Sequence, residues 1–101
     1  MITFTRTSCL DATKAAAAFG CAREVAICAK DITGVELLIA MPVGGNPWRI
    51  RWTSHFANLG AMEAAAAKLR ANPQYNQLVA RMSDCCIAGA TVDEVWRSDQ
   101  A

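Results

Sequence analysis

The sequence lacks the features that mark several common classes of protein. It contains one histidine, and its five cysteines form no Cys-x-x-Cys pair, which argues against a zinc site. The formal net charge of +1 leaves no basic excess for binding nucleic acid. No apolar run is long enough to cross a membrane. We therefore expect no metal, no nucleic-acid partner and no membrane insertion.

The start of the chain also lacks an export signal, since no basic segment is followed by a continuous apolar stretch. A cytoplasmic protein with reduced thiols is the expectation. The neighbouring Cys85 and Cys86 do not change it, because adjacent cysteines rarely form a disulfide. The length of 101 residues predicts one domain spanning residues 1–101.

What the sequence does contain is a regular switching of its hydrophobic period. Alternating or continuous apolar residues predict strands over 2–7, 35–43, 47–56 and 91–97. Between them, helical spacing predicts a helix from Ala12 to about Ile32 and a second that begins after Asn58 and is interrupted at Asn72-Pro73. The order βαββαβ is the ferredoxin-like α+β arrangement, in which one four-stranded antiparallel sheet carries both helices on one face.

The third strand, "PWRIRWTSHF", separates two kinds of side chain by its alternation. The turn over 44–47 sets the register of the hairpin by pairing Val43 with Trp48. The row that contains this pair predicts a helix-facing core of Val35, Leu37, Ile39, Met41, Val43, Trp48, Ile50, Trp52, Ser54 and Phe56. The other face is more polar. Its predicted cross-strand pairs are Ala40 with Arg51, Leu38 with Thr53 and Glu36 with His55, and Thr3, Thr5 and Thr7 of the first strand lie on the same side.

The stretch "WRIRWTSHFANLGAMEAAAAKLRANPQYNQLVARM", followed by "AGATVDEVWR", resembles NIPSNAP-like members of the dimeric α/β-barrel superfamily. This resemblance implies a homodimer in which two sheets pack face to face around a shared barrel. The superfamily also includes haem-binding relatives, which place a ligating histidine on the second helix and an asparagine on the first strand. This chain has neither, so no cofactor is expected. The superfamily hosts many chemistries, and the resemblance does not identify an activity.

Two hypotheses about function remain open at this level. In the first, the barrel binds a small anionic or aromatic organic molecule, with Arg49, Arg51, Thr53 and Thr5 as ligand-binding residues. His55, oriented by Glu36, would be the catalytic proton-transfer residue of a cofactor-independent monooxygenase or isomerase. In the second, the same polar residues form only ion pairs and hydrogen bonds across a non-catalytic dimer interface. The tryptophans and Tyr75 are expected in the core or the interface.

Overall fold

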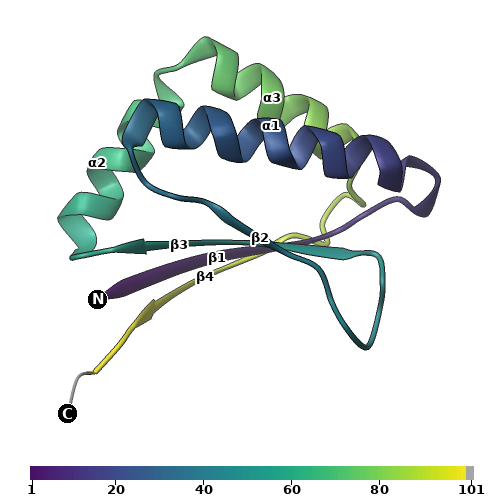
Figure 1. Ribbon diagram of the computed structural model, residues 1–101, viewed down its shortest axis with the longest axis horizontal. Coiled ribbons are helices and arrows are strands. Elements are labelled where there is room, and N and C mark those ends of the chain that lie inside the picture. The colour runs from purple at the N-terminus through teal and green to yellow at the C-terminus, as the bar shows by residue number, and fades with distance from the viewer. Residues whose placement is uncertain (100–101) are drawn as a thin grey trace.

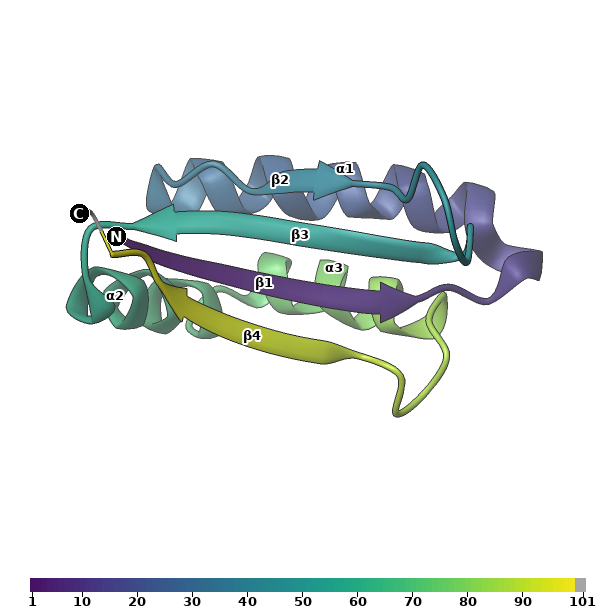
Figure 2. The same cartoon turned by 90° about the horizontal axis from the view of Figure 1, so that it is seen from below.

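Four antiparallel strands form one sheet with the spatial order β2-β3-β1-β4 (Figure 2). The structure, a computed structural model, describes residues 1–99. In chain order the elements are β1 (Ile2–Cys9), α1 (Ala15–Thr33), β2 (Leu38–Ala40), β3 (Arg49–Phe56), α2 (Leu59–Arg70), α3 (Pro73–Asp84) and β4 (Val92–Arg97). All three helices cover the same face of the sheet (Figure 1). The predicted ferredoxin-like βαββαβ fold is confirmed.

The helices begin at the predicted capping residues. Asp11 accepts a hydrogen bond from the Thr13 amide and starts a short 3-10 turn that leads into α1. Asn58 and Asn72 cap α2 and α3 in the same way, through the amides of residues 61 and 75. At the other end of α1, Gly34 has a φ of 73° and its N–H donates to the Lys30 carbonyl, which is the left-handed C-cap that glycine adopts without strain.

The hydrophobic core lies between the helix layer and the sheet. Ile50 and Leu10 are almost completely buried, and Trp52 is 5% exposed. From the helices, α1 contributes the small side chains of Ala18, Ala22 and Val25, and α3 contributes Met82. Because alanine occupies little space, α1 can approach the sheet closely at these positions.

The predicted strand over 35–43 is too long at both ends, since β2 spans only Leu38–Ala40. On one side the Val35 amide donates to Thr33 Oγ1, which holds it at the end of α1. On the other side Pro42 has no N–H to donate to a ladder. Met41, Val43 and Trp48, also predicted to face the core, lie in the loop between β2 and β3 and are exposed. The loop leaves the ladder here, since the Trp48 amide donates to Asn46 Oδ1 instead of a strand partner.

The hairpin register itself is confirmed where β2 pairs with β3. Leu38 lies opposite Thr53, residue 39 opposite Trp52, and Ala40 opposite Arg51. The sheet face away from the helices is not covered by any element of residues 1–99 (Figures 1 and 2). No helix in this part of the chain is both long and apolar enough to span a membrane.

Candidate functional site

Two adjoining hollows lie between the sheet and the helices. One has a volume of about 230 Å³ and the other about 450 Å³. They share five lining residues, namely Phe4, Arg6, Leu37, Tyr75 and Val79. We call the pair the helix–sheet cavity. Its walls are mainly apolar, with a few polar groups from β1, β3 and α3, which is the usual composition of a small-molecule site.

Trp52 supplies the most unusual polar group of this cavity. Its side chain is 5% exposed and lines the smaller hollow. Within residues 1–99, its indole Nε1 is buried and has no hydrogen-bond partner. A buried donor without an acceptor costs about 1–3 kcal/mol, and most proteins avoid it. Trp52 thus contributes to the lining of the smaller hollow while its N–H stays unsatisfied.

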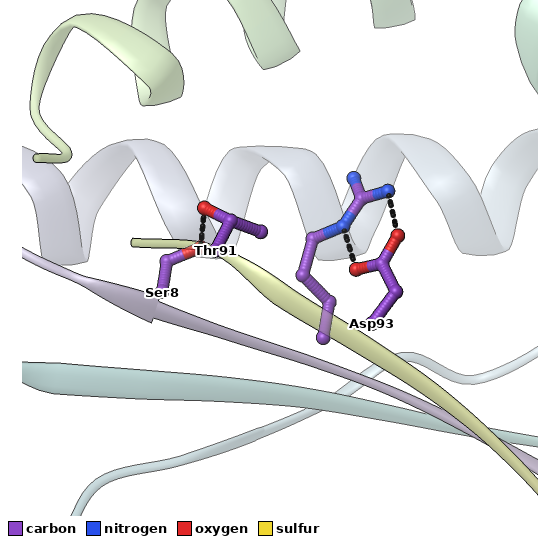
Figure 3. Close-up of polar contacts among 4 residues, drawn as sticks. Ser8, Thr91 and Asp93 are labelled. Atoms are coloured by element: carbon purple, nitrogen blue, oxygen red, sulfur yellow. Dashed lines mark hydrogen bonds and ion pairs between the residues drawn. The ribbon is translucent and has the colours of Figure 1, made fainter. Parts of the chain in front are cut away.

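Arg6 lies on β1 between both hollows and is held by Asp93 of β4. Its Nε donates to Asp93 Oδ1 at 2.7 Å and its Nη2 donates to Oδ2 at 2.9 Å, so the pair is bidentate. Figure 3 shows both oxygens of Asp93 engaged, beside a hydrogen bond of 3.0 Å between Ser8 and Thr91. These hydrogen bonds lower the pKa of Asp93 and raise the pKa of Arg6. The charge of Arg6 is thus already neutralised.

Tyr75 of α3 is a further polar residue of the lining. It lies at the first turn of the helix, where Asn72 Oδ1 accepts its backbone N–H, and its ring lines both hollows. Burial raises the pKa of its phenol. The hydroxyl is consequently protonated at neutral pH and can act as a hydrogen-bond donor to a ligand.

The residues predicted as ligand-binding lie together on the open face of the sheet. Thr5 is the cross-strand partner of Thr53, and Thr7 is the partner of Arg51. Arg51 Nε also donates to Thr7 Oγ1 at 3.2 Å. Arg49, one pleat further along β3, faces the same side. None of these residues lines the helix–sheet cavity.

The predicted catalytic residues, His55 and Glu36, are not paired with each other in the sheet. His55 lies opposite Thr3, and a hydrogen bond of 3.0 Å joins Thr3 Oγ1 to His55 Nδ1. Glu36 is exposed and precedes β2, so it lies outside the ladder that would align it with His55. The structure gives His55 a hydroxyl partner from β1, and the pairing of His55 with Glu36 stays a prediction.

The cysteines are free thiols in the structure. Cys86 Sγ donates to the Met82 carbonyl and Cys21 Sγ donates to the Leu78 carbonyl. Burial raises the pKa of both thiols, which makes them poor nucleophiles. Across residues 1–99, no three His, Cys, Asp or Glu side chains are grouped so that they could hold a metal ion.

Comparison with solved protein structures identifies the fold. No protein-family model matches the chain, and no curated protein matches it. Among solved structures, a NIPSNAP family protein from Agrobacterium tumefaciens has a TM-score of 0.81 at 16% identity, over 97% of this chain and 85% of that one. A NIPSNAP domain protein from Burkholderia xenovorans gives 0.80 at 15% identity, over 98% and 95% of the two chains. The fold is that of NIPSNAP-like proteins.

A second group of structures shares this NIPSNAP-like fold. A proposed antibiotic biosynthesis monooxygenase from Deinococcus radiodurans has a TM-score of 0.76 at 19% identity, over the whole of this chain and 95% of that one. At these identities the similarity establishes the fold alone. The resemblance predicted from the sequence is confirmed at that level.

Sequence reasoning missed the helix–sheet cavity and the pair that borders it. One signal was present in the sequence, since Arg6 lies on the same face of β1 as the apolar residues Ile2 and Phe4. An arginine in such a row must either reach solvent or find an acidic partner. Asp93 occupies the facing position on β4 and is that partner. Within the NIPSNAP-like fold, this places a polar pair beneath the helices and beside the cavity.

Proposed function

We propose that the protein binds a small aromatic molecule in the helix–sheet cavity. The observation that carries this proposal is the buried, unpartnered N–H of Trp52 in the wall of a cavity lined by Phe4 and Tyr75. A ligand with a hydrogen-bond acceptor on its ring system would satisfy that donor while its apolar surface fills the hollow. The two aromatic side chains offer faces and edges for a ring.

The aromatic half of the ligand predicted from the sequence fits this cavity better than the anionic half. In the smaller hollow, which contains Trp52, the guanidinium in the lining is that of Arg6, and both oxygens of Asp93 already accept from it. A second arginine, Arg70, lines the larger hollow from the exposed end of α2. Beside Trp52, a carboxylate ligand would therefore have to displace Asp93 or remain without a counter-charge. A neutral ligand avoids both costs, so an aromatic ketone is the favoured class.

An enzymatic form of this proposal is a cofactor-independent monooxygenase or isomerase. Support for it comes from structural neighbours described as proposed antibiotic biosynthesis monooxygenases. In this chain the protonated hydroxyl of Tyr75 is the group in the cavity that could donate a proton to a bound carbonyl. Proton transfer by His55 and a cytoplasmic location both stay predictions.

The test uses two probes that differ in one acceptor. 1-Tetralone, a bicyclic aromatic ketone, and tetralin, its hydrocarbon, are compared by thermal shift, because a ligand that binds only the native state raises the melting temperature. We expect the ketone to stabilise the wild type more than the hydrocarbon. Trp52→Phe should remove that preference and weaken ketone binding about tenfold, the value of one neutral hydrogen bond.

Trp96→Phe is the matched control, since Trp96 is 60% exposed on the open face and remote from the cavity lining. This variant should keep the preference for the ketone. If neither probe stabilises the wild type, or if Trp52→Phe retains the full preference for the ketone, the cavity is not the binding site and the proposal fails.

The second candidate function is homodimerisation through the open face without catalysis. The observation that favours it is a row of exposed apolar side chains on that face: Leu38 is 47%, Val92 57% and Trp96 60% exposed. Such a patch is typical of a protein contact. Light scattering at micromolar concentration should give twice the chain mass of 10.8 kDa, and Leu38→Glu should halve it. A wild-type protein of single-chain mass would contradict this function.

A further inference from the structure

A separate pocket of about 270 Å³ lies where the β2–β3 hairpin meets β1. We call it the hairpin pocket. It is lined by Thr7, Ala40, Met41, Pro42, Gly44, Arg49, Ile50 and Arg51. Two of these residues are arginines and none is acidic. The pocket shares no lining residue with the helix–sheet cavity, so its ligand chemistry is independent of the proposed function.

The positive charges of the hairpin pocket have no ion-pair partner. The ion pairs formed within residues 1–99 involve Arg6 and Arg81, and neither Arg49 nor Arg51. Both pocket arginines lie on the same face of β3, two residues apart, so that their Cα atoms are separated by about 7 Å. Side chains of that length can reach a single ligand from such positions.

Each arginine is also held in place by its surroundings. Arg51 Nε donates to Thr7 Oγ1 at 3.2 Å, which leaves its terminal nitrogens free to donate elsewhere. Arg49 Nε is buried and has no hydrogen-bond partner. Burying part of a guanidinium without a counter-charge costs free energy, and a bound anion would offset that cost.

The loop supports this arrangement at Gly45. Its φ is +77°, and a Cβ built there would lie 3.2 Å from Arg49 Nη2. The loop backbone therefore approaches the guanidinium more closely than most side chains would permit. Glycine at this position therefore leaves room for the Arg49 guanidinium beside the loop.

We propose that the hairpin pocket binds a small oxyanion, with Arg49 and Arg51 as its charge partners. The planar guanidinium donates two parallel hydrogen bonds to a carboxylate or a phosphate, and two such groups with no competing acid favour either anion over chloride. Thr7 orients Arg51. In this proposal, the anion predicted from the sequence binds in the hairpin pocket and the aromatic molecule binds in the helix–sheet cavity.

The test titrates the full-length chain with inorganic phosphate and, separately, with acetate, at constant ionic strength set by sodium chloride. Backbone amide NMR shifts are followed. We expect saturable shifts within residues 41–51, and the stronger of the two titrations identifies phosphate or carboxylate as the source of the anion. Arg51→Gln and Arg49→Gln should each weaken binding about tenfold or more, because charge-assisted hydrogen bonds are lost.

Arg23→Gln is the matched control, since Arg23 is exposed on α1 and its removal changes the net charge equally. It should leave the affinity unchanged. Arg51 is exposed, so its glutamine variant is expected to fold even if the Arg49 variant does not. Equal weakening by Arg23→Gln, full binding by Arg51→Gln, or no saturable shift with either anion would overturn the proposal. The proposal would also be overturned if the wild type bound neither anion and the Arg51→Gln variant had half the wild-type mass in light scattering. A carboxylate of a partner chain would then occupy the pocket.

Discussion

Replacing Asp93 by asparagine tests the bidentate ion pair between Arg6 and Asp93. The two side chains are 41% and 45% exposed, and both hydrogen bonds are short, at 2.7 and 2.9 Å. Exposed pairs contribute about 0.2–1 kcal/mol, and the loss of one partner from a fully buried pair costs about 3–5 kcal/mol. Because solvent screens a pair that is about two-fifths exposed, we expect Asp93→Asn to lower the free energy of unfolding by about 1 kcal/mol, near the top of the range for exposed pairs. For a domain of this size, that lowers the melting temperature by roughly 4–8 °C.

The loss should depend on pH in a defined direction. Hydrogen bonding to Arg6 lowers the pKa of Asp93 in the folded state, whereas the unfolded chain has the ordinary value of about 3.9. The stabilisation is therefore fully present above the unfolded value and is lost as the pH falls through the folded value. Thermal unfolding followed by circular dichroism should show a difference between wild type and Asp93→Asn at pH 7 that shrinks below pH 4.

A comparison with Glu24→Gln isolates the effect of geometry. Glu24 accepts one hydrogen bond of 2.8 Å from Arg81, and these side chains are 57% and 62% exposed. Its replacement should change the free energy of unfolding by less than about 0.5 kcal/mol. If Asp93→Asn costs no more than Glu24→Gln at pH 7, or if its cost is undiminished at acidic pH, the stabilising role assigned to the pair is wrong.

Three further predictions concern the core, a helix cap and the thiols. Ile50→Ala, at a side chain that is completely buried, should destabilise the fold by about 2–5 kcal/mol in urea unfolding, and a loss below 1 kcal/mol would contradict its central place in the core. Asn72→Ala removes the side-chain acceptor of α3 and should cost about 1 kcal/mol, whereas Asn72→Ser should restore most of it. Cys21 and Cys86, whose pKa values are raised by burial, should react with iodoacetamide at pH 8 more slowly than an unfolded thiol; equal rates in native and denatured protein would refute this.

Local signals in the sequence were sufficient for most of the architecture. Capping by Asp11, Asn58 and Asn72 depends on residues within one helical turn, so it can be read from short segments. The β2–β3 register follows from the turn length, and the pairing of Ala40 with Arg51 confirms it. The length of β2 could not be read in this way, because it depends on how the end of α1 uses the Val35 amide.

The candidate sites were harder to predict, because they depend on distances between elements. Trp52 and Tyr75 have the spacing of core residues, and Trp52 is indeed buried, but whether an indole N–H finds an acceptor depends on the whole packing arrangement. The grouping of Arg49 and Arg51 on one face followed directly from alternation. The pocket that they form with residues 40–44 depends on the path of the loop between β2 and β3, which no periodicity specifies.

The central position of β1 in the sheet has a consequence for folding during synthesis. β1 begins at Ile2 yet pairs on one side with β3 and on the other with β4, whose register joins Thr7 to Val92. A nascent chain can close the β1–β3 ladder once about half of it has emerged, but one edge of β1 then stays open until the last strand arrives. During that interval its unpaired N–H and C=O groups can recruit a foreign strand. Translation speed over the final third of the message should therefore affect the yield of correctly folded protein.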